Sequence, residues 1–221
     1  MSLALRDNLE FCITGGRAIF LDLAAGRYFA LSDRHFAAFQ RWISGEVSLE
    51  DGTDRLNGLV SQGILIETDG ADVRPKTSIS GIALPAVRFP VTRLRASPTL
   101  VAWIIFDRLL WRRRIKNWPF VRLIKSVRKS ARPDRLSSNS IVLPRIIRSF
   151  EIADLIIGNH DRCLERSLAL VAACRRYGLA NTLVLAIQAN PFAAHCWVQN
   201  QSYILNDHPD RVSMFTPILA L

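Results

Sequence analysis

The first third of the chain alternates apolar and polar residues in three short runs joined by glycine-containing turns. The runs are residues 9–14, 17–23 and 27–32. Runs of this kind, separated by two or three turn residues, predict a three-stranded antiparallel meander. Apolar residues then recur at helical spacing from Phe36 to Ile43 and again after Ser48, and residues 64–68 predict a closing strand. Strands followed by helices in this order predict a winged-helix-like module over residues 1–70.

The middle of the chain interleaves apolar and basic residues at helical intervals. A stretch rich in Gly, Pro, Ser and Thr, residues 71–86, predicts a linker before it. Pro119 lacks the amide proton that a helix interior needs, so the pattern predicts one helix on each side of it. Trp103, Trp111 and Trp118 are expected to pack these helices onto the domain that follows.

The last third predicts helices followed by strands. The pattern is helical from Pro144 onward, and a second helix begins near Cys163 and ends at Gly178. Residues 181–188 are rich in β-forming side chains and predict a strand, and two further strands flank a turn at residues 200–202. The predicted fold class of the whole chain is therefore α+β.

The net charge of +10 is concentrated in the middle of the chain. Residues 81–148 carry 16 basic and 2 acidic side chains, whereas residues 1–80 and 149–221 have net charges of −3 and −1. A basic segment can bind nucleic acid or an anionic membrane surface. Because no helix-turn-helix, zinc-finger or RNA-binding motif accompanies the charge, we expect a solvated basic face and no nucleic-acid partner. A peripheral membrane contact through this segment stays open.

The cysteines indicate reduced thiols. Cys12, Cys163, Cys174 and Cys196 form no CxxC pair and have no regular spacing, which argues against a disulfide framework or a zinc site. The longest apolar run of the middle segment, residues 100–106, is far shorter than the ~20 residues that span a bilayer. Acidic residues interrupt the N-terminus before any signal-like run. We expect a cytoplasmic protein without a metal.

Cys163 is the candidate nucleophile because it lies in the first turn of its helix. Free N–H groups and partial positive charge at a helix start stabilise a thiolate, and the same groups can receive an oxyanion. Asp161 is the expected N-cap of this helix. Cys174 lies deep inside the helix and is expected to be an inert packing residue.

The predicted hairpin after this helix brings a histidine and a carboxylate together. With a three-residue loop and Gln199 opposite Tyr203, His195 faces Asp207 across the strands, about 5 Å apart at Cβ. Cys196 then points to the other face, because side chains alternate along a strand. A thiolate, an imidazole base and a carboxylate that orients the imidazole are the groups that cysteine-dependent acyl transfer needs.

The element order of the first module and its stretch FLDLAAGRYFALS resemble the RiPP recognition element, a domain that binds the leader of a ribosomally made precursor peptide. The resemblance implies that the leader adds a strand to the sheet edge at residues 27–32 and lies against the helix at residues 51–62. The residues implied to bind the leader are Arg27, Tyr28, Phe29, Ala30, Leu31, Leu56 and Leu59.

The stretches CLERSLAL, RRYGL, PFAAHCWV and ND are similar to the lasso-peptide B-protein family, in which a transglutaminase-like, papain-related cysteine leader peptidase follows or pairs with a recognition element. The resemblance implies a peptidase domain over residues 87–221, with Cys163 as nucleophile, His195 as base and Asp207 as the group that orients the base. Cys196 departs from the family, where a small residue such as Ala usually follows the histidine.

The resemblance also implies two partners: the leader of the precursor, and a separate ATP-dependent lasso cyclase that closes a macrolactam ring after cleavage. The chain contains neither GxxxxGK[ST] nor GxGxxG. We therefore expect no cofactor in this chain and assign ATP to the cyclase.

Two other interpretations of the sequence stay open. A transglutaminase uses the same thioester chemistry with an amine in place of water. A basic adaptor that binds nucleic acid or a membrane surface through an inactive papain-like domain needs no catalysis at all. Within the catalytic interpretation, His160 and His208 are alternates for the base.

Overall fold

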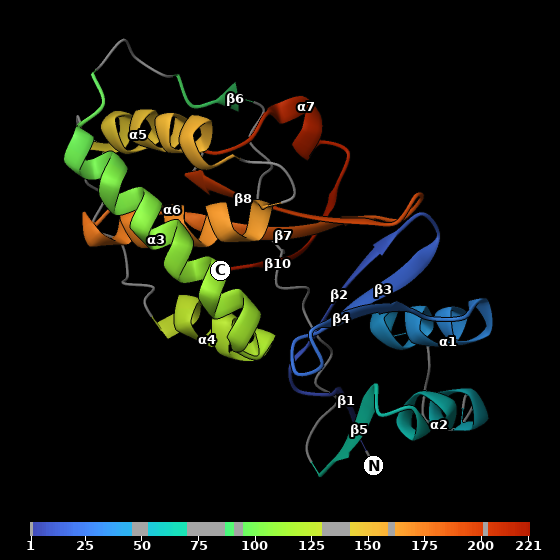
Figure 1. Ribbon diagram of the computed structural model, residues 1–221. Coiled ribbons are helices and arrows are strands. Elements are labelled where there is room, and N and C mark those ends of the chain that lie inside the picture. The colour runs from blue at the N-terminus through green and yellow to red at the C-terminus, as the bar shows by residue number, and fades with distance from the viewer. Residues whose placement is uncertain are drawn as a thin grey trace. The chain divides into compact units, whose positions relative to one another are not determined.

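A computed structural model describes residues 2–45, 53–69, 87–90, 95–129, 142–158, 162–200 and 203–221. The chain divides into two compact units, residues 1–80 and residues 81–221, whose elements are labelled in Figure 1. The predicted linker at residues 71–86 lies outside the described residues. None of the described helices is long and apolar enough to cross a membrane.

Unit 1 contains the predicted meander and one strand that the sequence did not reveal. Its elements are β1 (Ser2–Leu5), β2 (Leu9–Thr14), β3 (Arg17–Asp22), β4 (Arg27–Ala30), α1 (Asp33–Ser44), α2 (Thr53–Ser61) and β5 (Leu65–Thr68). β2, β3 and β4 form the antiparallel sheet. β5 pairs instead with β1, which has only four residues and therefore shows too little alternation to predict a strand. The expected start of the second helix, near Ser48, lies outside the described residues, and the winged-helix-like assignment stays a prediction.

Four phenylalanines form the centre of the unit 1 core. Phe20 on β3 is directly opposite Phe11 on β2 and Phe29 on β4, and its ring centroid lies 5.8 and 5.2 Å from theirs. Phe39 of α1 meets Phe20 edge-on at 5.0 Å. The phenylalanines of the alternating pattern therefore all face α1, and this packing fixes the register of the meander.

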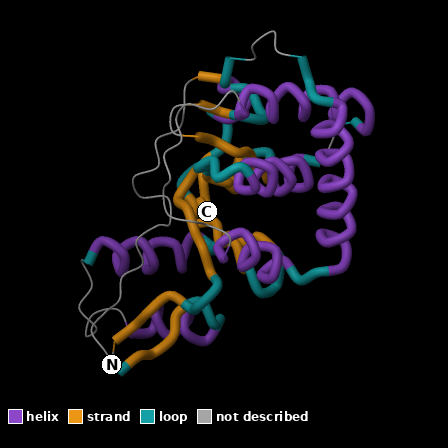
Figure 2. The backbone as a smooth tube through the Cα atoms, turned by 90° about the vertical axis from the view of Figure 1, so that its left-hand side faces the viewer, coloured by secondary structure: helices purple, strands orange, loops and turns teal. Residues whose placement is uncertain are grey.

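Unit 2 is a five-stranded sheet with helices packed on it. Its elements are β6 (Val87–Arg88), α3 (Pro98–Asn117), α4 (Phe120–Lys129), α5 (Val142–Ile157), α6 (Cys163–Arg176), β7 (Thr182–Gln188), β8 (Ala193–Asn200), β9 (Tyr203–Ile204), α7 (Pro209–Val212) and β10 (Thr216–Ala220). The strand order is β10-β7-β8-β9-β6, so β8 is central. α3 packs against α5 and α6, and α6 packs against β8; Figure 2 shows the helices of this unit gathered beside the sheet.

The two faces of the sheet bury different residues. Val184 and Trp197 are partners on neighbouring strands and share a core with Phe215, on the face that α7 covers. Leu185 and Cys196 are the next partners along and point to the opposite face, where Cys196 contacts α6. Strand alternation thus separates an α7 side from an α6 side, and the sequence predicted the alternation along β8 but not α7.

The basic helices are positioned partly as expected. The break at Pro119 is confirmed, since α3 ends at Asn117 and α4 begins at Phe120. Trp111 is buried, but Trp103 is 57% exposed, so its predicted packing role is wrong. Apolar residues occur on every side of the first half of α3, and such a sequence does not indicate which aromatic faces inward.

One basic residue of α3 is completely buried. The Arg108 guanidinium donates to Asp154 of α5 at 2.7 Å, to Glu165 of α6 at 3.1 Å and to the Gly158 carbonyl at 2.8 Å. Arg166 binds the same Asp154 carboxylate at 2.6 and 3.0 Å. This network, Arg108–Asp154–Glu165–Arg166, joins three helices at the start of α6, and so it fixes the position of the helix end that carries Cys163.

Replacing Arg108 by Met tests this network. The change leaves the buried carboxylate of Glu165 without its cation, which typically costs about 3–5 kcal/mol. We expect Arg108→Met to lower the free energy of unfolding of unit 2 by about that amount in urea denaturation. Tryptophan fluorescence reports this unit, because Trp42 is the only tryptophan outside it.

Arg112→Met is the matched control, because Arg112 lies on the same helix and is exposed. It should change the free energy of unfolding by less than about 0.5 kcal/mol. Equal effects of the two substitutions would show that the buried network contributes nothing specific.

Candidate functional site

Cys163 is the first residue of α6 and is half-buried. The helix is preceded by Arg162, which makes no side-chain capping hydrogen bond, and the expected cap Asp161 lies outside the described residues. Its neighbours on β8 act on its charge: the side chain of Cys196, the side chain of His195 and the Cys196 main-chain N–H all lower the pKa of Cys163. The start of α6 is therefore in direct contact with the middle of β8.

His195 lies on β8, and its imidazole has a fixed orientation. Its Nε2 is hydrogen-bonded to Oδ2 of Asp207, which leaves Nδ1 for the sulfur of Cys163. The other oxygen of Asp207 accepts the His208 main-chain N–H at 2.8 Å. The Phe215 ring packs on the imidazole with centroids 4.9 Å apart. The carboxylate and the aromatic ring together hold the imidazole toward the cysteine.

The register predicted for this hairpin is wrong by one residue. Gln199 pairs with Ile204, and Asn200 pairs with Tyr203. Two residues, 201 and 202, therefore lie between the paired residues, where three were expected. A strand that continued in this register would place Asp207 on the same face as Cys196, away from His195.

Asp207 still reaches His195 because the strand stops early. β9 ends at Ile204, and the side chain of Asn206 takes over the pairing: its Oδ1 accepts the Val198 N–H at 2.8 Å. The chain bends there, and the bend turns Asp207 toward the α7 side of the sheet. The predicted pair of residues meets, but through a bend and not through strand register.

The charges of the site favour a thiolate beside an imidazolium. The hydrogen bond from the Cys196 thiol, opposed by burial and aided by His195, lowers the pKa of Cys163 to about 4. Burial alone lowers the pKa of His195, but the hydrogen bonds and charges of Asp207 and Cys163 outweigh it and raise it to about 9. Burial raises the pKa of Asp207, and the hydrogen bonds from His195 and the His208 N–H more than reverse this. At neutral pH the sulfur is therefore negative and the imidazole positive.

The other cysteines differ from one another. Cys174 is fully buried inside α6, and burial raises its pKa to about 12, in keeping with a packing role. Cys196 points away from His195, as strand alternation predicts, and its thiol lies 3.7 Å from the Ser167 hydroxyl. Cys196 nevertheless stabilises the Cys163 thiolate, and it lowers the pKa of Cys163 more than His195 does.

The alternate bases are placed differently from His195. The Nδ1 of His208 lies 3.3 Å from Asp210, and 60% of its side chain is exposed. His160 lies outside the described residues. Within the described part of the chain, no group of three or more His, Cys, Asp and Glu residues could hold a metal ion.

Several residues around the site were not found from the sequence. Ser167 and Asn206 bind each other at 2.9 Å behind Cys196, and Glu165 and Arg166 hold the start of α6 through the buried network. Glu165 and Arg166 could have been recognised in the sequence, because they are a pair of charges inside the apolar stretch CLERSLAL.

The residues expected to bind a leader fall into two groups. Arg27, Tyr28, Phe29 and Ala30 form β4, which lies at one edge of the meander; Arg27 and Ala30 are exposed, and Tyr28 and Phe29 are half-buried. Leu31, Leu56 and Leu59 are core residues with 5%, 4% and 0% exposure. These three leucines cannot touch a peptide on the surface in this conformation, because the periodicity that singled them out is that of core packing.

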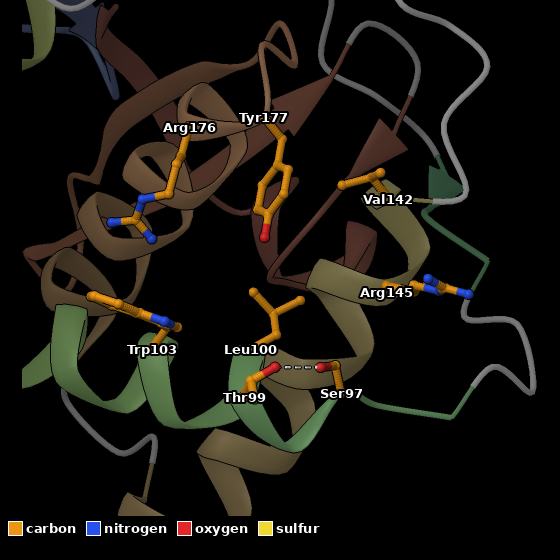
Figure 3. A pocket seen from close by; sticks show the side chains of 8 residues that line it. All are labelled: Ser97, Thr99, Leu100, Trp103, Val142, Arg145, Arg176 and Tyr177. Carbon is orange, nitrogen blue, oxygen red and sulfur yellow. Dashed lines mark hydrogen bonds between the residues drawn. The ribbon is translucent and has the colours of Figure 1, made fainter.

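A separate pocket of about 410 Å³ lies at the other end of α6 (Figure 3). It is lined by Ser97, Thr99, Leu100, Trp103, Val142, Arg145, Arg176 and Tyr177. α6 has 14 residues, which at 1.5 Å per residue separates its two ends by about 20 Å. This pocket is therefore remote from Cys163 and takes no part in the chemistry around it.

Comparison with known proteins identifies the family of this unit. The family model described as "Transglutaminase-like superfamily" matches residues 105–220, which is more than half of the chain and includes α6, β8 and the bend at Asp207. No curated protein and no solved structure matches the chain. A cysteine at a helix start, held against a strand histidine that a carboxylate orients, lies within the matched residues, and the chain belongs to the transglutaminase-like superfamily.

Proposed function

We propose that this protein is a cysteine peptidase that cuts the leader from a ribosomally made lasso-peptide precursor. One observation carries the proposal: Asp207 binds the imidazole of His195, and Cys196 and His195 together lower the pKa of Cys163. The superfamily is compatible with peptidase or acyl-transfer chemistry. The assignment to lasso-peptide maturation rests on the resemblance of CLERSLAL, RRYGL, PFAAHCWV and ND to the B-protein family.

Acylation follows from the charges of the site. The Cys163 thiolate attacks the carbonyl carbon at the end of the leader, and the negative oxygen that forms is stabilised by N–H groups at the start of α6. The His195 imidazolium gives its proton to the leaving amine, which is the N-terminus of the core peptide. The leader remains attached to Cys163 as a thioester.

Deacylation uses the same groups in reverse. Neutral His195 takes a proton from water, the hydroxide attacks the thioester carbonyl, and the sulfur leaves as a thiolate that the returning imidazolium stabilises. Asp207 stays ionised throughout and holds the imidazole in the tautomer that faces the sulfur. If an amine enters instead of water, the same thioester gives an amide, so the choice between hydrolysis and transglutamination depends on which acceptor reaches it.

Unit 1 is proposed to hold the leader. β4 is an edge strand of a three-stranded sheet, and an extended peptide can pair with such an edge through main-chain hydrogen bonds. After the three buried leucines are removed, the proposed contact residues are Arg27, Tyr28, Phe29 and Ala30. The lasso cyclase, with its ATP, is the proposed partner that receives the cleaved core.

Cleavage of a candidate precursor, followed by mass spectrometry, tests the catalytic assignment. Cys163→Ala should lower the cleavage rate by a factor on the order of 10⁴ or more. Asp207→Asn should lower it by roughly 10²–10⁴, because the imidazole loses its orientation. The masses of the products distinguish hydrolysis, which adds water, from transfer to an added amine.

Two matched controls accompany these variants. His208→Ala should retain most activity where His195→Ala does not, and Cys174→Ala should retain the activity that Cys163→Ala loses. Cleavage by Cys163→Ala at the wild-type rate would exclude the proposed nucleophile, and an intact precursor after incubation with wild-type protein would exclude leader cleavage.

The pH dependence of alkylation tests the ion pair without a substrate. Because the pKa of Cys163 is lowered to about 4, its thiolate is fully present above that pH and is lost only below it. The rate constant for iodoacetamide labelling of Cys163 should therefore be nearly constant from pH 5 to pH 8 by peptide mapping. An ordinary cysteine with a pKa of about 8.5 would gain roughly tenfold per pH unit over this range, and such a profile would contradict the ion pair.

His195→Ala removes one of the groups that stabilise the thiolate, so it should raise the pKa of Cys163 and slow labelling at pH 6. His208→Ala serves as the control and should leave the profile unchanged.

Binding of a leader peptide tests the role of β4. Ala30→Pro places a residue without an N–H on the edge strand and should weaken binding of a fluorescent leader to the full-length protein by about tenfold or more. Arg17→Ala, an exposed change at the start of the central strand, is the control. Equal affinity of Ala30→Pro and wild type would exclude pairing along β4.

A further inference from the structure

Cys163 and Cys196 place two sulfurs in one hydrogen-bonded group. Cys163 is the first residue of α6 and is half-buried. Cys196 lies on β8 and is 4% exposed. Ser167 lies one turn after Cys163 on the same face of α6, and its hydroxyl lies 3.7 Å from the Cys196 sulfur. Cys163 is therefore on the side of α6 that faces Cys196, and each of the two cysteines shifts the pKa of the other. Only the outer sulfur can meet molecules from solvent.

Two polar side chains fix the inner thiol in place. The Ser167 hydroxyl donates to the Cys196 carbonyl at 3.3 Å and accepts from the Cys196 thiol at 3.7 Å. Asn206 donates to the same hydroxyl at 2.9 Å. These contacts hold the Cys196 side chain against the face of α6 that carries Cys163.

We propose that Cys163 and Cys196 form a reversible disulfide, with Cys196 as the thiol that resolves a sulfenic acid formed on Cys163 by a hydroperoxide. The expected loss of peptidase activity rests on the proposed function, because the disulfide would consume the thiolate of Cys163 that the peptidase needs. Reduction restores the nucleophile, so the site would be inactive under oxidising conditions and recover afterwards.

The first step oxidises the outer sulfur. The Cys163 thiolate attacks one oxygen of the hydroperoxide: an S–O bond forms, the O–O bond breaks, and the leaving oxygen takes a proton to become water or an alcohol. Sulfur loses two electrons and the peroxide gains them. Thiolates react in this way and thiols do not, so the half-buried thiolate of Cys163 reacts before the buried, protonated Cys196.

The second step closes the disulfide. The sulfur of Cys196 attacks the sulfenic sulfur: an S–S bond forms, the S–O bond breaks, and the hydroxyl leaves with the Cys196 proton as water. The hydrogen bond to the Cys163 thiolate, burial and the negative charge of that thiolate all raise the pKa of Cys196. Oxidation of Cys163 removes the charge, which makes Cys196 easier to deprotonate at the moment when it must attack. Bond formation requires the two sulfurs to approach to about 2.05 Å.

Treatment of the reduced full-length protein with hydrogen peroxide tests the proposal. We expect the intact mass to fall by two hydrogen atoms and peptide mapping to find Cys163 joined to Cys196. Iodoacetamide labelling of Cys163 should be lost and should return after dithiothreitol. Accumulation of sulfinic acid on Cys163 without a disulfide, or a disulfide that uses Cys12 or Cys174, would overturn the proposal.

Cys196→Ser is the decisive variant, since it keeps a hydrogen-bond donor beside Cys163 and removes the resolving sulfur. We expect its Cys163 to proceed to sulfinic acid, with labelling that dithiothreitol does not restore. Cys174→Ala should form the disulfide as wild type does. If Cys196→Ser fails to fold, the peptide map of wild type still decides the question.

The two proposals fail separately. A disulfide in a protein that never cleaves a precursor under reducing conditions supports this proposal and contradicts the proposed function. Cleavage that continues after the disulfide has formed would show that Cys163 is not the nucleophile, and cleavage without any disulfide would contradict the redox proposal alone.

Discussion

The buried guanidinium of Arg108 is the constraint on which unit 2 depends. A charge with no exposure is stable only when carboxylates surround it, and here they come from α5 and from the first turn of α6. Glu165, which meets that requirement, is two residues from Cys163, and Arg166 extends the same network to the Asn206 carbonyl at 3.4 Å, beside Asp207. The ion pairs that hold three helices together therefore also fix the positions of Cys163 and of the Asp207 carboxylate. This coupling makes the geometry of the site a property of the helix packing.

The site itself shows why neighbouring positions on a strand can have opposite roles. His195 and Cys196 point to opposite faces of β8, yet Cys196, through its side chain and its main-chain N–H, and His195 both lower the pKa of Cys163. The positive charge of His195 and the side chain of Cys196 both stabilise the thiolate form of Cys163. The proposed activation of Cys163 and its proposed oxidation would then have a single structural cause, which is the closeness of Cys196.

The basic character of the middle segment divides between structure and surface. Arg108 is committed to the interior, and Arg176 at the end of α6 binds Asp107 at 3.0 Å while it lies over the Trp103 ring at 5.6 Å. Arg114 and Arg122 likewise stack on Trp118. Part of the charge that suggested an anionic partner is therefore used within unit 2, in ion pairs and in contacts with the exposed faces of aromatic rings.

The sequence by itself determined the elements and the chemical set. The alternation of apolar and polar residues predicted the meander, and Pro119 predicted the break between α3 and α4. The order of Cys163, His195 and Asp207 predicted which groups come together. Each of these signals can be read from the spacing or the type of the residues themselves. Only the tertiary structure decided how they meet. The hairpin register depends on a one-residue difference in loop length that the sequence does not encode locally. The bend at Asn206, held by a side-chain hydrogen bond, turns Asp207 back toward His195 despite that register. The burial of Arg108, the exposure of Trp103 and the contact between Cys163 and Cys196 are long-range packing outcomes, and long-range packing leaves no periodic trace in the residues that take part in it.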